Sequence, residues 1–163
     1  MQAIIATIIA LAIGAMGVIE VMRHSDSLFS SSQVTGQIAD ISELMSDSKS
    51  KMGPNKSRYT NFTTANAQNL NYGGIVPSTM IVNGVLQNRW GNPIQLTNAR
   101  QGGQAIFTTN WADVQTCADV ATGIGGYETI TIGSVVFSKD NPPDQVTAIN
   151  ACASTWQMSI AWS

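Results

Sequence analysis

Charged residues are scarce in this sequence, and so are the side chains on which most catalytic sites depend. Lysine, arginine, aspartate and glutamate make up 11% of the 163 residues, against about 25% in an average soluble domain. The net charge is −2 and no run of basic residues occurs, which argues against nucleic acid as a main partner. His24 is the single histidine, and no group of histidine, cysteine and carboxylate residues has the spacing of a metal site. Nothing in this composition points to a cofactor or a metal.

The sequence motifs of the common enzyme classes are absent as well. There is no phosphate-binding Walker loop and no GxSxG nucleophile turn. Asp113 and Asp119 flank Cys117, but a cysteine nucleophile needs a base beside it, and we expect His24 to lie elsewhere. Trp90 offers a surface on which a sugar could stack, although packing is the commoner role of tryptophan. We therefore expect no enzyme, and we assign all four tryptophans to packing between elements: Trp90, Trp111, Trp156 and Trp162.

No charged residue precedes Glu20. The apolar run from Met1 to Ile19 would span about 28 Å as a helix, close to the ~30 Å hydrocarbon core of a bilayer. We therefore expect residues 1–24 to cross a membrane or to fill the core of a filament. A secretory signal normally begins with a cationic region, which is missing here. Two interpretations are open: a processed product whose basic leader has been removed, or an ordinary anchor whose Met1 is the initiator.

Small residues interrupt this apolar run. Gly14 and Gly17 each cost a helix interior about 1 kcal/mol relative to alanine. In lipid, small residues let helices approach one another closely. These two glycines therefore predict a helix that packs against copies of itself and that can stretch or melt locally.

Proline is also absent before Pro54, so nothing in the sequence forces an early helix end. Val34, Ile38, Ile41 and Met45 recur at spacings of three and four and share one helical face. We expect one long helix over residues 2–52, whose second half, about residues 25–52, is amphipathic and lies on a globular head. The serine-rich residues 25–32 offer an alternative break point.

The expected head spans residues 25–163 and continues after the helix with a loop over 53–78 and a sheet over 79–112. Asn83-Gly84 predicts a tight turn, and residues 92–99 and 104–110 form a second hairpin around residues 100–103. The remaining pattern predicts, in order, a helix at 113–122, a strand at 128–138, a loop at 141–143 and a half-buried strand at 154–162. The predicted fold class is α+β, with an antiparallel sheet facing the long helix.

The chain has only two cysteines, Cys117 and Cys152. An even count behind a membrane-type segment favours an oxidising compartment and one disulfide. Such a bridge would close a loop of about 36 residues and stabilise the fold by about 3–4 kcal/mol. It would bound a C-terminal region over residues 113–163. The alternative is two free, buried thiols.

Together these features resemble a type IV pilin, and more specifically the type IVb class. The resemblance rests on the expected apolar helix that continues into an amphipathic one. It also rests on three later motifs: VPSTM…NRWGNPIQL, VQTCADVAT and INACASTWQMSIAWS. It covers essentially the whole chain. The first feature is shared by many pilin-like proteins. The Val-Pro, Trp-Gly and Cys-Cys arrangement is more particular to the type IVb class and to the thin pili of conjugative plasmids.

The resemblance implies the type IV pilin fold and a subunit that polymerises into a helical filament for surface attachment, aggregation or conjugative mating contact. It also implies that a prepilin peptidase removes a basic leader and leaves Met1 as a processed, often N-methylated, first residue. The implied partners are copies of the chain, an inner-membrane platform and an assembly ATPase. The subunit would lie in the inner membrane before assembly and in the extracellular filament afterwards.

One position departs from the family pattern. Type IV pilins usually carry a glutamate at the fifth residue, paired with the N-terminal amine of a neighbouring subunit, whereas this chain has Ile5. Glu20 lies about 22 Å further along a helix, which is too far to substitute. We expect either that packing alone sets the register or that the N-terminus is held in another way.

Other protein classes are open as alternatives. A type II secretion pseudopilin or minor pilin would begin with a similar helix, but pseudopilins often carry a calcium loop, for which Asp140, Asn141 and Asp144 lack the ligand spacing. A membrane-anchored periplasmic binding module would be a monomer with a ligand cleft. An anchored enzyme is disfavoured by the missing site chemistry. The modest size of the chain favours a major subunit over a minor one.

Overall fold

The structure, a computed structural model, describes residues 32–163. The chain divides into two compact units, Met1–Thr35 and Gly36–Ser163. Of the first unit only residues 32–35 are described, and they are helical. The second unit opens with a helix over residues 36–51, which we call the first helix. The expected membrane or filament-core segment, residues 1–24, lies outside the described residues.

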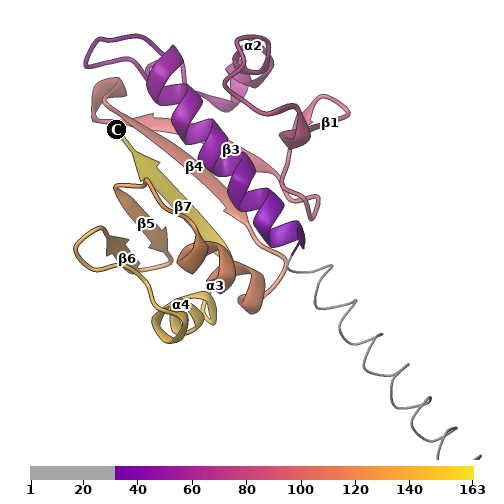
Figure 1. Ribbon diagram of the computed structural model, residues 1–163, viewed down its shortest axis with the longest axis vertical. Coiled ribbons are helices and arrows are strands. Elements are labelled where there is room, and N and C mark those ends of the chain that lie inside the picture. The colour runs from indigo at the N-terminus through magenta and orange to yellow at the C-terminus, as the bar shows by residue number, and fades with distance from the viewer. Residues whose placement is uncertain (1–31) are drawn as a thin grey trace, which may run out of the picture. The chain divides into compact units, whose positions relative to one another are not determined.

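Short elements follow the first helix, and then come the strands of the main sheet (Figure 1). The short elements are η1 (Thr64–Asn66), α2 (Ala67–Tyr72), η2 (Ser78–Met80), β1 (Ile81–Val82) and β2 (Val85–Leu86). The main body consists of β3 (Ile94–Ala99), η3 (Arg100–Gly102), β4 (Gln104–Asn110), α3 (Val114–Gly123), β5 (Thr129–Ile132), β6 (Val135–Ser138), α4 (Gln145–Cys152) and β7 (Gln157–Trp162).

The main sheet is antiparallel, with the strand order β3-β4-β7-β5-β6. The last strand of the chain therefore lies at the centre of the sheet. The register aligns one residue from each strand in a single row, and all five are buried: Leu96, Phe107, Ile160, Ile130 and Phe137. Because residues opposite one another point to the same face, this row makes one face of the sheet apolar.

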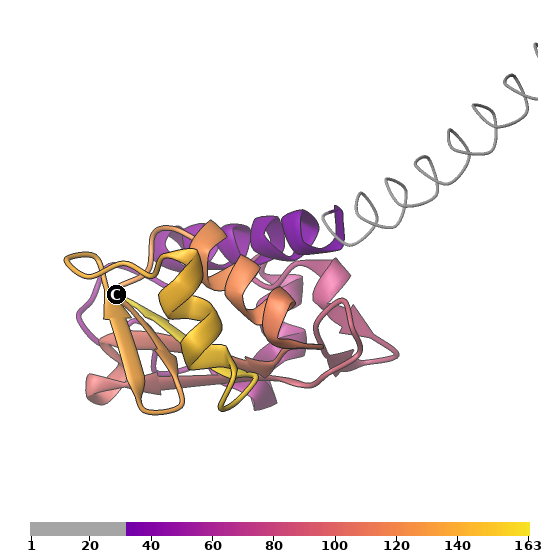
Figure 2. The ribbon, with the colours of Figure 1, turned by 90° about the horizontal axis from the view of Figure 1, so that it is seen from below.

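The first helix lies across the sheet, over β3 and β4 (Figures 1 and 2). Ile41 and Leu44 are fully buried and Met45 is 3% exposed. Spacings of three and four place these side chains on one side of the helix, where they bury apolar surface. α3 ends against the same helix, because Gly123 lies so close to Ile38 that a β-carbon there would sit 2.7 Å from its Cδ1.

Several sequence predictions are confirmed. The head is α+β with helices packed on an antiparallel sheet. Residues 92–110 contain the β3–β4 hairpin, and the predicted helix at 113–122 is α3. The Asn83-Gly84 turn joins β1 to β2, with positive φ of 52° and 78° at the two residues, as tight hairpins require.

Two predictions are wrong, and one helix was not predicted. Residues 128–138 are two strands, β5 and β6, that turn at Gly133, where φ is 61°. The stretch after the Asn141-Pro142-Pro143 loop is a helix, α4, which the sequence pattern did not suggest. Trp156 precedes β7 and is 48% exposed, so it does not pack between elements, whereas Trp111 and Trp162 are buried.

Candidate functional site

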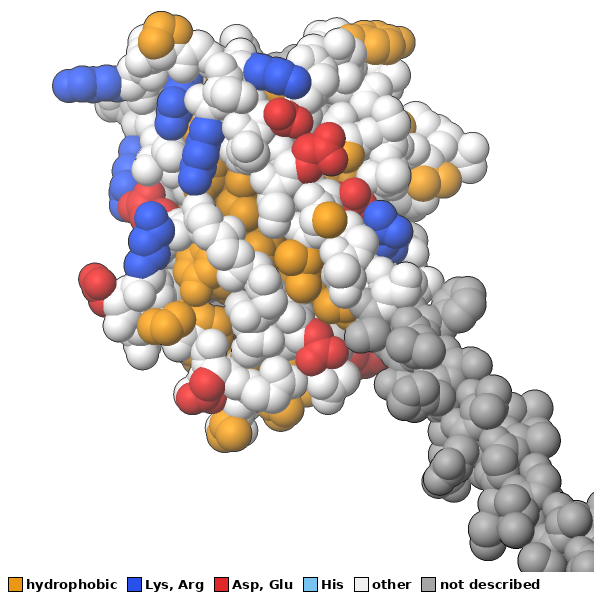
Figure 3. Space-filling view, viewed as in Figure 1, with side chains coloured by type: hydrophobic (Ala, Val, Ile, Leu, Met, Phe, Trp, Pro, Cys, Tyr) orange, Lys and Arg blue, Asp and Glu red, His pale blue; other side chains and the backbone are white. Residues whose placement is uncertain are grey.

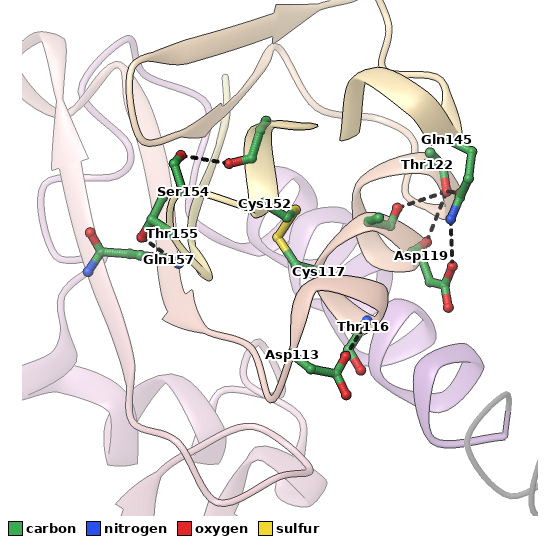
Figure 4. Close-up of a disulfide and its surroundings, with 12 residues drawn as sticks. Asp113, Thr116, Cys117, Asp119, Thr122, Gln145, Cys152, Ser154, Thr155 and Gln157 are labelled. Carbon is green, nitrogen blue, oxygen red and sulfur yellow. Dashed lines mark hydrogen bonds between the residues drawn. A yellow bond between two sulfur atoms is a disulfide. The ribbon is translucent and has the colours of Figure 1, made fainter. Parts of the chain in front are cut away.

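One disulfide links the two helices of the C-terminal region, α3 and α4. Cys117 on α3 and Cys152 on α4 are joined at an S–S distance of 2.08 Å, with their Cα atoms 6.0 Å apart, and both are fully buried (Figure 4). The disulfide expected from the sequence is therefore present, and the alternative of two free thiols is wrong. It encloses β5 and β6, so this part of the head is both packed and covalently closed.

Polar side chains fix the starts of both helices beside the disulfide. The Asp113 carboxylate accepts a hydrogen bond from Thr116 N at 2.8 Å, at the N-terminus of α3. The Asp144 carboxylate accepts one from Thr147 N at 2.8 Å, while Asp144 N donates to Thr147 Oγ1, which forms a capping box at α4. The bond from Thr147 N holds the pKa of Asp144 below its usual value. These caps satisfy N–H groups that a helix otherwise leaves without partners.

A third carboxylate links the two helices to each other. Asp119 Oδ1 accepts hydrogen bonds from Gln115 Nε2 at 2.8 Å and from Gln145 Nε2 at 3.2 Å. Gln115 and Asp119 lie one turn apart on α3. Gln145 is the first residue of α4 and lies beside Asp119 (Figure 4). The α3–α4 surface is thus an ordered polar surface that carries three acidic groups.

A partly buried polar clamp attaches the loop between β2 and β3 to the first helix. Arg89 N donates to Gln37 Oε1 at 2.9 Å, and the Arg89 guanidinium donates to Asp40 Oδ2 at 3.2 and 3.1 Å. Gln37 is fully buried and Asp40 is 7% exposed. The Arg89 side chain is 34% exposed, so the buried member of the pair is Asp40. Losing Arg89 would leave the Asp40 carboxylate buried without its cation.

Next to the clamp, Trp90 packs edge-to-face against Trp111, with ring centroids 5.8 Å apart. Trp90 is partly buried and Trp111 is 1% exposed. The geometry is that of a favourable aromatic pair. Both residues therefore take the packing role expected of them, and part of the Trp90 ring contacts Trp111.

The described residues hold no metal-type cluster. Among residues 32–163, no three histidine, cysteine, aspartate or glutamate side chains come together as potential metal ligands. The described head has open hollows on its surface. One of about 500 Å³ is lined by Lys51, Met52, Arg58, Asn61, Asn66, Asn69 and Leu70. Another, of about 410 Å³, lies beside β3 and β4 and includes Thr64, Gln95 and Gln157. No helix within this part of the chain combines the length and apolar character that a bilayer span needs.

Along the predicted helix face, Val34, Ile41 and Met45 are buried and Ile38 is partly buried. The predictions for Met1, Gly14, Gly17 and His24 lie outside the described residues. Sequence reasoning missed the polar members of the same stripe. Gln37 and Ser48 are both fully buried, and together with Ile41 and Leu44 they follow the 4-3-4 spacing that could have revealed them.

A comparison with known protein families supplies a match that spans most of the chain. The family model described as "PilS N terminal" matches residues 31–162. That range contains the first helix, all five strands of the main sheet and both cysteines. None of the curated proteins matches the chain. The chain belongs to the PilS N-terminal family and is a pilin-related protein.

Proposed function

We propose that the chain is the major structural subunit of a type IVb pilus and acts by polymerising into a helical filament. The observation that carries this proposal is the family match over residues 31–162, on a head in which a helix packs across an antiparallel sheet and a disulfide closes the C-terminal region. The sequence adds an apolar run before Glu20. Such a run has to be covered by lipid or by other apolar helices.

The proposed assembly depends on the chain having both an apolar segment and a folded head. Moving an apolar segment from the membrane into a bundle of identical segments exchanges lipid contacts for helix contacts. The net free energy of the move is small, so assembly is reversible and contacts between heads provide the specificity. One contact between two different surfaces, repeated from subunit to subunit, generates an open helical filament.

The head has the features that a filament surface exposed to solvent and shear requires. The disulfide ties α3 to α4, and the Arg89 clamp and the buried apolar face hold the first helix to the sheet. In this proposal a prepilin peptidase, an inner-membrane platform and an assembly ATPase act on the subunit. The inner membrane holds the chain before assembly, and the extracellular filament serves attachment, aggregation or conjugative contact.

Deletion and complementation test the proposal. Cells that carry the matching secretion system are examined by negative-stain electron microscopy after the gene for this chain is deleted and then restored. We expect thin filaments to vanish on deletion and to return with the wild-type gene. Filaments that persist without the chain would overturn the proposal. A fall in filament number with unchanged filament composition would instead identify a minor pilin.

A further inference from the structure

Three cations gather where the first helix ends. The pKa of Lys49 is lowered, first by burial and then by repulsion from Lys139 and Arg58, so both of these charges lie within electrostatic reach of Lys49. Lys49 Nζ donates a hydrogen bond to Gly126 O at 3.0 Å, and Arg58 Nη1 donates to Lys49 O at 3.2 Å. We call Lys49, Arg58 and Lys139 the basic triad. Figure 3 shows lysine and arginine side chains collected at this upper left end of the head, with acidic side chains also on that side.

The basic triad has no anionic partner within the described part of the chain. The ion pairs among residues 32–163 are Lys51–Asp47, Arg89–Asp40 and Arg100–Glu128. Like charges held together without an ion-pair partner destabilise a fold, since each repels the others. The hydrogen bonds of Lys49 and Arg58 nevertheless hold two of the three in place. This arrangement favours a partner that brings negative charge.

The same head offers negative charge elsewhere. Asp119 lies on α3, and Asp113 and Asp144 are the N-cap residues of α3 and α4. These three residues form no ion pair within the head described here. Asp113 and Asp144 are exposed, and Asp119 is held in place by two glutamine side chains. We call these three residues the acidic face. In Figure 3 acidic side chains lie along the lower edge of the head, in the region of α3 and α4.

The two surfaces are offset along the first helix. α3 ends at Gly123 beside Ile38, and Asp119 lies one turn before that end. Lys49 is further along the first helix by about 16 Å, at 1.5 Å per residue. A neighbouring head shifted along this direction would therefore bring its acidic face level with the basic triad. The chain's net charge of only −2 leaves such a contact without strong overall repulsion.

We propose that the basic triad of one head binds the acidic face of the next copy of this chain in the filament. The inference rests on the proposed function and names the partner surface of its repeating contact. A contact between two different surfaces is the kind that continues without closing. Opposed charges give such a contact its register and its direction, because the reversed arrangement would place like charges together.

Charge reversal tests the contact. Lys139→Glu reverses the charge of an exposed residue of the basic triad. Asp119→Lys reverses the charge of the one residue of the acidic face that is not a helix N-cap. We expect each single variant to lower the yield of sheared filaments at least about tenfold, equivalent to about 1.4 kcal/mol in one contact. The double variant should recover at least half of the wild-type yield. Lys56→Glu, an exposed cation outside the triad with the same charge change, serves as the matched control.

The outcomes separate this inference from the proposed function. Thermal unfolding of each purified variant shows whether its head still folds. Normal filament yield from Lys139→Glu, or no recovery in a folded double variant, would overturn the contact and leave the filament proposal intact. Absence of filaments from the wild-type chain would overturn both. A second readout is carbodiimide cross-linking of filaments mixed from ¹⁴N and ¹⁵N subunits, where mixed-isotope cross-links should join Lys49 or Lys139 to Asp119 or Asp144. Mixed-isotope cross-links that join only other residues would contradict the contact.

Discussion

The indole nitrogen of Trp162 donates a hydrogen bond to Ser48 Oγ at 2.9 Å, between residues 114 positions apart. Both side chains are fully buried, and Ser48 Oγ in turn donates to Met45 O at 2.9 Å. Phe62 packs edge-to-face on the Trp162 ring at a centroid distance of 5.5 Å. The last strand of the chain is therefore tied to the first helix by a polar contact inside the core, at the centre of the sheet.

Ser48→Ala should destabilise the head. It removes the acceptor of a buried indole N–H, and a buried donor without a partner costs about 1–3 kcal/mol. Urea unfolding of the head, followed by tryptophan fluorescence, measures the change in free energy. Ser50→Ala is the matched control, because Ser50 Oγ makes a similar bond to Asp47 O but is exposed, and it should change stability by less than about 0.5 kcal/mol. Equal effects of the two substitutions would show that the Ser48–Trp162 bond contributes nothing specific.

Replacing both cysteines by serine should also destabilise the head. The bridge between Cys117 and Cys152 has a sequence separation of 35, for which the chain-entropy model gives about 3–4 kcal/mol. The double variant leaves no free thiol to form other bridges. Its melting temperature is compared with that of the wild type, with and without reductant. A wild-type melting temperature that does not respond to reductant would count against this role of the disulfide.

Gly102→Ala should cost more than Gly91→Ala. Both glycines have positive φ, 85° and 83°, so alanine at either position pays about 1–2 kcal/mol of backbone strain. At Gly91 a β-carbon meets nothing, whereas at Gly102 it would meet Thr60 Oγ1, Ser57 O and Thr60 N. Overpacking of this kind adds about 1–3 kcal/mol. Urea unfolding of the two variants side by side measures the difference, and equal losses would contradict the close approach of these loops.

The head should lose stability in alkaline solution. Burial raises the pKa of the Tyr59 and Tyr127 hydroxyls, so the folded state favours their neutral forms. The unfolded chain ionises at its ordinary pKa of about 10, and stability is then intact below about pH 10 and falls as the pH rises toward the raised values. Free energies of unfolding from pH 8.5 to 11 measure this fall, and Tyr59→Phe should reduce its slope. An unchanged slope in that variant would remove Tyr59 from the explanation.

Local parts of this fold were predictable from the sequence. The β3–β4 hairpin, α3 and the alternating Met158, Ile160 and Trp162 of β7 each follow from periodicity and turn residues within a short window. The position of β7 between β4 and β5 was not predictable, because the sheet order depends on contacts between residues far apart in the sequence. The hairpin turn at Gly133 was missed because β-branched residues continue on both sides of it.

The helix α4 was missed for a different reason. Val146, Thr147 and Ile149 are β-branched and weak helix formers, so local propensity does not favour a helix there. The capping box between Asp144 and Thr147 was a usable signal. The helix is also held by the disulfide at Cys152, a tertiary constraint that sequence periodicity does not contain.

The polar contacts of the candidate site were the least predictable part. Gln37, Ser48 and Arg89 acquire their roles only when the first helix meets segments far along the chain. The basic triad likewise joins residues from the first helix, the loop after it and the position directly after β6. Their charges were visible in the sequence, but their proximity depends on the fold.

The most direct test of the proposed filament role is the intact mass of the protein in purified filaments. Filaments are sheared from cells that express the chain with its secretion system, purified and dissolved for mass spectrometry. We predict that the main component has the mass of this chain less two hydrogens, for the disulfide. A mass higher by one methyl group would further support an N-methylated Met1. Filaments built from another protein, with this chain left as a monomer in the membrane fraction, would contradict the account.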